Sequence, residues 1–184
     1  MSKKLAIFDL DGTLFNTNDV NYNAYKKALE EFGYTIDYNY FCNFCNGKKY
    51  NEFLPKIVND NNIIDLVHRR KKELYHNYID KAKINTHLFD MIKILKKEYK
   101  IIIVTTASNK NTVELLTYYK FLDLFDMIIS QDDVVHTKPD PEGFNLAIKR
   151  YNSTPNDTII FEDSESGLKA AKRTGATVFK VEQF

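Results

Sequence analysis

Two carboxylates directly follow an apolar run near the start of the chain. Residues 5–8 are all apolar and are followed by Asp9, Leu10, Asp11 and Gly12, which predicts a short buried strand that ends in a polar turn. Residues two apart in an extended chain point to the same side, so we expect Asp9 and Asp11 to converge while Leu10 faces the core. Converging carboxylates repel each other unless a cation or a proton lies between them. The end of this strand is therefore a candidate site for an anion held through a metal ion.

Three further polar elements lie at or near the ends of apolar runs later in the chain. They are Thr105 after residues 101–104, Lys138 before Pro139, and Glu162 and Asp163 after residues 158–161. Taken singly, each has a simpler interpretation as a helix cap, a turn former or a solvated loop residue. Polar groups that recur in this way, at or near the end of one apolar run after another, are more than unrelated caps would be expected to give.

The elements that must position these side chains fall into two groups. Helical patterns without strands occupy residues 20–32, 37–45, 48–58 and 63–79. Apolar strand-like runs then alternate with helical patterns: strands at residues 101–104, 127–129, 158–161 and 177–179, and helices at residues 88–99, 112–119, 141–151 and 164–173. Short apolar strands that alternate with helices are typical of a doubly wound parallel sheet covered on both faces. Right-handed crossovers then bring the carboxyl ends of all the strands to one edge.

We therefore expect an α/β core domain of residues 1–14 and 87–184, with an inserted helical domain of residues 15–86. At the second boundary we expect Thr86 to cap the helix that follows.

Composition excludes several classes of protein. The 26 basic and 25 acidic side chains give a net charge of +1, so no overall field favours nucleic acid. We interpret the basic run at residues 68–72 as a solvated helix face. No apolar run approaches the ~20 residues of a membrane span, and the run before Asp9 is too short for a signal peptide. We expect a cytoplasmic monomer with neither a nucleic-acid nor a membrane partner.

The only two cysteines, Cys42 and Cys45, form a C-x-x-C pair. A zinc site would need two further ligands, and neither a second cysteine pair nor a spaced histidine pair is present. A thioredoxin-like pair would follow a strand, whereas this one lies in an aromatic helical stretch. We expect two unreactive, partly buried thiols.

The order and spacing of the four polar elements resemble the haloacid dehalogenase-like superfamily. The resemblance is to its branch with a helical cap after the first strand, which includes phosphoglycolate phosphatase and β-phosphoglucomutase. It spans nearly the whole chain and is especially close over residues 161–175. It implies a Rossmann-like core with a helical cap, and a Mg²⁺-dependent phosphatase that hydrolyses a small phosphorylated metabolite through an aspartyl-phosphate.

The resemblance also implies roles that suit the chemistry of the residues. Asp9 would be the nucleophile, and Asp11 would be the general acid and then the general base. Lys138 and the Thr105 hydroxyl would bind the phosphate. The expected Mg²⁺ ligands are Asp9, Asp163 and the Asp11 carbonyl, with Glu162 as a further nearby ligand.

Substrate contacts are expected on both sides of the site. In the core these are Thr106 and Asn109, together with free backbone N–H groups near Thr106 and Ala107. In the cap they are Gly47 and Lys48, in the loop that aligns with the family's specificity loop.

Other activities of this superfamily remain open. Asp11 favours phosphate esters over dehalogenation, which does not need a second acid. A β-phosphoglucomutase type of isomerase is one alternative, although Asn21 stands where mutase-like members tend to carry histidine. Phosphonate cleavage would use a cap lysine, for which Lys48 and Lys49 are candidates. A non-catalytic phosphate-binding protein would be expected to have lost one of the four elements, and none is lost.

Overall fold

The computed structural model describes residues 4–182 and 184. The chain divides into two compact units, Met1–Asn16 with Lys83–Phe184, and Thr17–Ala82. In the larger unit, β2 (Phe15–Asn16) and β3 (Lys83–Ile84) form an antiparallel two-stranded ribbon. The domain boundaries expected from the sequence, after residue 14 and before residue 87, lie next to this ribbon and stay a prediction.

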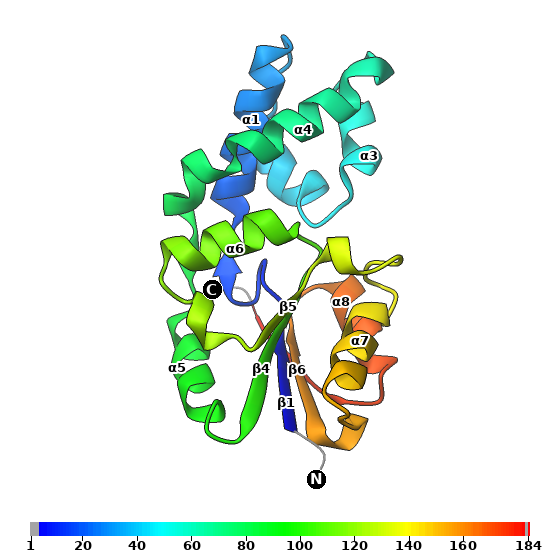
Figure 1. Ribbon diagram of the computed structural model, residues 1–184. Coiled ribbons are helices and arrows are strands. Elements are labelled where there is room, and N and C mark those ends of the chain that lie inside the picture. Colours follow the sequence, from blue (N-terminus) through cyan, green and yellow to red (C-terminus); the bar gives the residue numbers. More distant parts are fainter. Residues whose placement is uncertain (1–3, 183) are drawn as a thin grey trace. The chain divides into compact units, whose positions relative to one another are not determined.

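A five-stranded parallel sheet forms the centre of the larger unit, with the strand order β5-β4-β1-β6-β7 (Figure 1). Its strands are β1 (Lys4–Phe8), β4 (Tyr99–Val104), β5 (Met127–Ile129), β6 (Thr158–Glu162) and β7 (Thr177–Lys180). This arrangement confirms the predicted doubly wound parallel sheet. The central strands are apolar on both faces because helices cover both faces.

Helices lie on both sides of this sheet. On one face, side chains of β1, β4 and β6 pack against α7 (Glu142–Arg150) and α8 (Glu165–Lys172). Figure 1 shows α5 (Thr86–Leu95) on the opposite side from α7 and α8. The helix α6 (Asn109–Tyr118) follows β4. Short 3-10 turns occupy Leu122–Leu124, Gln131–Asp133 and Pro155–Asp157.

The start and the end of α5 differ from the sequence-based expectation. The Asn85 side chain, and not Thr86, caps the helix by accepting a hydrogen bond from the Leu88 N–H. Asn85 also donates to the Thr13 carbonyl, which ties the cap to the residues after β1. The helix was expected to reach Tyr99, but Tyr99 is the first residue of β4 and pairs with β1. Pairing in the sheet therefore outweighs the helical pattern of this residue.

The smaller unit is helical and has its own apolar core. Its helices are α1 (Asn18–Glu31), α2 (Tyr38–Tyr40), α3 (Tyr50–Phe53) and α4 (Ile64–Leu74), with a π-helical turn at Phe41–Cys45 and 3-10 segments at Leu54–Lys56, Asn61–Ile63 and Tyr75–Lys81. Both cysteines are free thiols, with Cys45 buried and Cys42 half-buried. Among the described residues, no helix has the length and apolar character that crossing a membrane would require.

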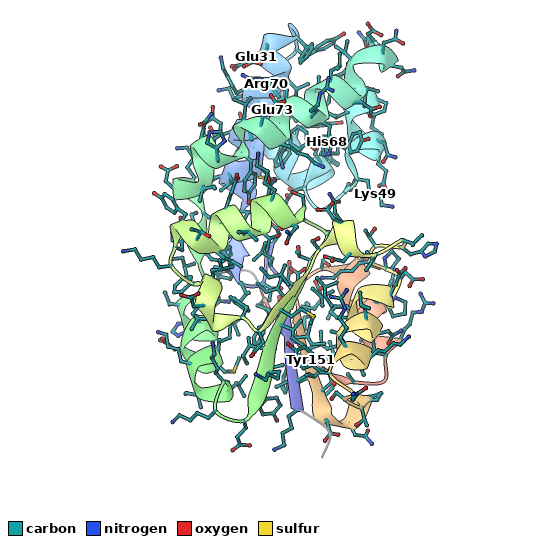
Figure 2. The ribbon with its side chains drawn as sticks, in the orientation of Figure 1. Glu31, Lys49, His68, Arg70, Glu73 and Tyr151 are labelled. Carbon is teal, nitrogen blue, oxygen red and sulfur yellow. The ribbon has the colours of Figure 1, made fainter. Side chains whose placement is uncertain are left out.

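The basic run at residues 68–72 is only partly a solvated face, which corrects the expectation. Arg70 pairs with Glu31 and Glu73 at the surface of the helical unit (Figure 2). Lys71, in contrast, is buried: its Nζ donates to Asn21 Oδ1 at 2.6 Å and lies over the rings of Tyr25 and Tyr75. The aromatic faces and the amide oxygen explain how a lysine is accommodated there.

Candidate active site

The candidate site lies where the strand order of the sheet reverses. From β1 the chain moves outward to β4 and β5 and then returns to the other side of β1 to form β6 and β7. Ligands of open α/β sheets bind at such a switch point, outside the carboxyl ends of the strands. Asp9 follows β1, Thr105 follows β4 and Asp163 follows β6, so the topology carries all three to this edge.

Lys138 joins the ends of two of these strands. Its Nζ lies 2.5 Å from Asp9 Oδ1 and 2.6 Å from Glu162 Oε2, and all three side chains are buried. The loop that carries Lys138 continues through a cis peptide bond to Pro139. Burial alone would lower the pKa of Lys138, but the charges and hydrogen bonds of Asp9 and Glu162 outweigh it and raise the pKa above its usual value. Lys138 is therefore a fixed positive charge at this edge.

The carboxylates of this cluster are not fully balanced by that charge. Burial, and then the charges of Glu162 and Asp163, raise the pKa of Asp9 well above its usual range, although Lys138 opposes this shift. Burial also raises the pKa of Asp163 to about 6, against the hydrogen bond from Thr13. Three carboxylates thus face one ammonium group. An additional cation would relieve their repulsion.

The donor set of the cluster fits a hard divalent cation. Asp9, Glu162 and Asp163 each offer an oxygen, and these oxygens lie within 4.8 Å of one another. Carboxylate oxygens are the ligands that Mg²⁺ prefers. Glu162 differs from the two aspartates because protein donors occupy it: Oε1 accepts from Asp163 N, Ser164 N and Ser164 Oγ, and Oε2 accepts from Lys138. The aspartates are therefore the better ligand candidates.

Two residues of the turn after β1, Gly12 and Thr13, lie against the Asp163 carboxylate. Gly12 has φ of +95°, and a Cβ at this position would overlap the Asp163 carboxylate, so only glycine permits this approach. The Thr13 hydroxyl donates to Asp163 Oδ1 at 2.8 Å and is fully buried. Thr13 was not among the predicted site residues, although its place directly after Asp-x-Asp-Gly was an available signal.

The loop after β4 bears the predicted phosphate-binding residues of the core. The Thr105 Oγ1 accepts a hydrogen bond from the Ala107 N–H at 3.0 Å, so the Ala107 N–H is not free, contrary to expectation. Thr105 and Thr106 line a small open pocket together with Thr137 and Lys138. Asn109, whose N–H donates to Asp132, is exposed at the start of α6.

The remaining predicted residues lie in the turn after β1 and in the helical unit. Asp11 is half-buried and forms an isolated β-bridge with Phe15; its convergence with Asp9 stays a prediction. Gly47 and Lys48 lie in an exposed loop of the helical unit, next to Lys49, which Figure 2 labels. Their contact with a substrate also stays a prediction.

Comparisons with known proteins agree with the motifs. Residues 6–181 match the family model described as haloacid dehalogenase-like hydrolase. A phosphorylated carbohydrates phosphatase of Thermotoga maritima is 30% identical over 92% of this chain and 80% of its own. Validoxylamine A 7'-phosphate phosphatase of Streptomyces hygroscopicus is 28% identical over 94% of this chain and 82% of its own.

A solved structure shares the fold. CbbY of Rhodobacter sphaeroides, crystallised in complex with phosphate, superimposes with a TM-score of 0.86 and 23% identity over 100% of this chain and 88% of its own. The family model and the 30% identical relative confirm the family resemblance predicted from four polar elements. The chain belongs to the haloacid dehalogenase-like hydrolases, of the type that carries a helical cap after the first strand.

Proposed function

We propose that this chain is a Mg²⁺-dependent phosphatase that hydrolyses a small phosphorylated metabolite. The observation that carries the proposal is the buried cluster of Asp9, Lys138, Glu162 and Asp163 at the sheet switch point. The family assignment and the phosphatase names of two relatives make a phosphatase the supported enzyme class. Phosphoryl transfer depends mainly on positioning and on neutralisation of charge, which such a cluster offers.

In the first step, Asp9 acts as the nucleophile. A carboxylate oxygen of Asp9 forms a bond to phosphorus while the bond between phosphorus and the ester oxygen breaks. The departing alkoxide takes a proton from Asp11, which is the general acid. Lys138 offers its positive charge to the phosphoryl oxygens, and the Thr105 hydroxyl donates a hydrogen bond to one of them.

In the second step, the aspartyl-phosphate is hydrolysed. Asp11, now a carboxylate, accepts a proton from a water molecule as that water attacks phosphorus. The bond between Asp9 and phosphorus breaks, which releases phosphate and restores the Asp9 carboxylate. Splitting the reaction in this way replaces one difficult displacement by two easier ones.

Asp9, Asp163 and the backbone carbonyl of Asp11 would hold the Mg²⁺. When bound, the ion supplies positive charge beside the phosphoryl oxygens and favours the ionised form of Asp9. This suits a nucleophile whose pKa is raised by burial and by two neighbouring carboxylates.

A panel of phosphorylated metabolites, assayed with Mg²⁺ for released phosphate, tests this proposal. We expect release of phosphate from at least one sugar phosphate or short-chain phosphate, and none without a divalent cation. Hexose 1-phosphate separates hydrolysis from isomerisation, because a mutase would return hexose 6-phosphate in place of free phosphate. Turnover that persists in the Asp9→Asn variant would refute the role proposed for Asp9.

A further inference from the structure

Groups at the start of α8 donate three hydrogen bonds to the Glu162 carboxylate, in addition to the one from Lys138. Ser164 donates its N–H and its hydroxyl to Glu162 Oε1, at 3.0 and 2.9 Å, and the Asp163 N–H adds a third donor at 3.2 Å. Glu162 is fully buried. Because one of its oxygens is directed to the start of α8 and the other to Lys138, the position of the carboxylate determines where the Lys138 ammonium group is held.

Space for this carboxylate exists only because residue 167 lacks a side chain. A Cβ on Gly167 would overlap the carboxylate of Glu162, including the oxygen that accepts from Lys138. Gly167 is the third residue of α8 and has helical backbone geometry. Glycine is a poorer helix former than alanine, so its presence here needs a reason other than backbone conformation.

Ser164 links these two features. Its hydroxyl donates to Glu162, while its oxygen accepts a hydrogen bond from the Gly167 N–H at 3.0 Å and so caps α8. The same side chain therefore sets the start of the helix and the orientation of the carboxylate. Gly167 and Ser164 are both linked to Lys138 through the Glu162 carboxylate.

We propose that Gly167 and Ser164 are positioning residues for phosphate binding, which act by fixing Glu162 and, through it, Lys138. The inference rests on the proposed phosphatase function for its kinetic consequence. The displacement of the Glu162 carboxylate by a side chain at residue 167 follows from the geometry alone. A methyl group at residue 167 would meet the carboxylate carbon and both carboxylate oxygens of Glu162. It would displace the carboxylate and, with it, the acceptor of the Lys138 ammonium group.

The test is a double-mutant cycle between residues 167 and 162, with p-nitrophenyl phosphate and Mg²⁺ as the assay. We expect Gly167→Ala to lower kcat/KM by about 10- to 100-fold, as is typical when a residue that orients an active-site group is changed. In the Glu162→Ala background, which removes the atoms that would be overlapped, Gly167→Ala should have no further effect. Losses that multiply in the double variant would overturn the proposal, because they would show that Gly167 acts independently of Glu162.

Ser164 variants keep the proposal testable if Glu162→Ala fails to fold. Ser164→Thr retains the hydroxyl and should keep wild-type kcat and KM, whereas Ser164→Ala should raise KM and lower the affinity for inorganic phosphate as an inhibitor. Equal activity of the Ala and Thr variants would contradict a role of the hydroxyl in positioning. Lys169→Ala, on the exposed face of α8, is the control for general disturbance of the helix and should match the wild type.

A readout without turnover separates this inference from the proposed function. In protein labelled with ¹⁵N-lysine, the buried ammonium groups of Lys138 and Lys71 should both give slowly exchanging signals. Gly167→Ala should move or broaden the Lys138 signal and leave the Lys71 signal in place. An unchanged Lys138 signal would overturn the positioning proposal even if the enzyme is a phosphatase. A changed signal in a protein without phosphatase activity would support the positioning and reject the function.

Discussion

Among the residues that the structure describes, each unit holds a lysine with a buried side chain, and the two lysines have different surroundings. Lys138 of the larger unit contacts Asp9 and Glu162, with Asp163 close by. Lys71 of the helical unit contacts a neutral amide oxygen of Asn21 and the faces of Tyr25 and Tyr75. Both arrangements compensate a buried positive charge. Around Lys138, three carboxylates face one ammonium group.

In our proposal, this difference separates a site that performs chemistry from a site that serves packing. Packing alone would favour a cluster in which every group is satisfied. The cluster around Lys138 instead raises the pKa of Asp9, through burial and through two neighbouring carboxylates. Strongly perturbed groups gathered at one sheet edge are typical of functional sites.

The helical unit holds His68 neutral through burial and the charges of Lys72 and Lys71, which lower its pKa to about 4.

Replacement of each lysine by methionine is the strongest test of the comparison. Lys138→Met should lower kcat by about 10² to 10³-fold, since it removes a fixed charge from the phosphoryl oxygens. It should also reduce stability by about 3–5 kcal/mol, because buried carboxylates lose their partner. Lys71→Met should leave kcat unchanged and cost about 1 kcal/mol. Steady-state kinetics and urea unfolding measure both. Similar losses of kcat in the two variants would remove the distinction.

Binding of Mg²⁺ should affect the larger unit through the two aspartates. The ion is expected to raise the free energy of unfolding by about 2.7 kcal/mol at a concentration 100 times its Kd. Asp163→Asn should remove most of this gain, whereas Asp90→Asn, at an exposed ion pair on α5, should retain it. Thermal unfolding with and without Mg²⁺ provides the measurement. An equal gain in both variants would place the ion elsewhere.

Acid should weaken the helical unit through His68. Its pKa is lowered from 6.5 to about 4 in the folded chain, so between these values the unfolded chain binds more protons and stability falls as the pH falls. Because His68 is partly exposed to solvent, we expect a loss of about 1 kcal/mol between pH 7 and pH 5. His68→Gln should remove this loss, and His76→Gln, at an exposed position, should not. Urea unfolding at both pH values measures the difference.

The sheet and the residues at its edge could be predicted from local patterns. Strands such as β5 and β6 are short apolar runs followed by polar residues, and the parallel topology then requires Asp9, Thr105 and Asp163 to share one edge. The family resemblance depended on the same residues. Sequence alone could not show which protein donors occupy Glu162, because those contacts depend on the three-dimensional path of the chain after β6.

The features that were missed depend on contacts between distant residues. Lys71 is buried because Asn21 and Tyr25 face it from α1, which no pattern within residues 68–72 reveals. Asn85 caps α5 because it is also held by the carbonyl of Thr13. The sequence around Gly167 does not indicate why this residue is a glycine. The reason emerges only when the structure places the Glu162 carboxylate beside it.

Detection of a phosphoryl group on Asp9 tests the central claim most directly. Enzyme mixed with substrate and Mg²⁺ would be quenched in acid within the first turnover, digested and analysed by mass spectrometry. We expect the peptide with residues 5–16 to gain one phosphoryl group, attached to Asp9, and the Asp9→Asn variant to show none. Full turnover with no phosphorylated peptide, or with the phosphoryl group on another residue, would contradict the claim.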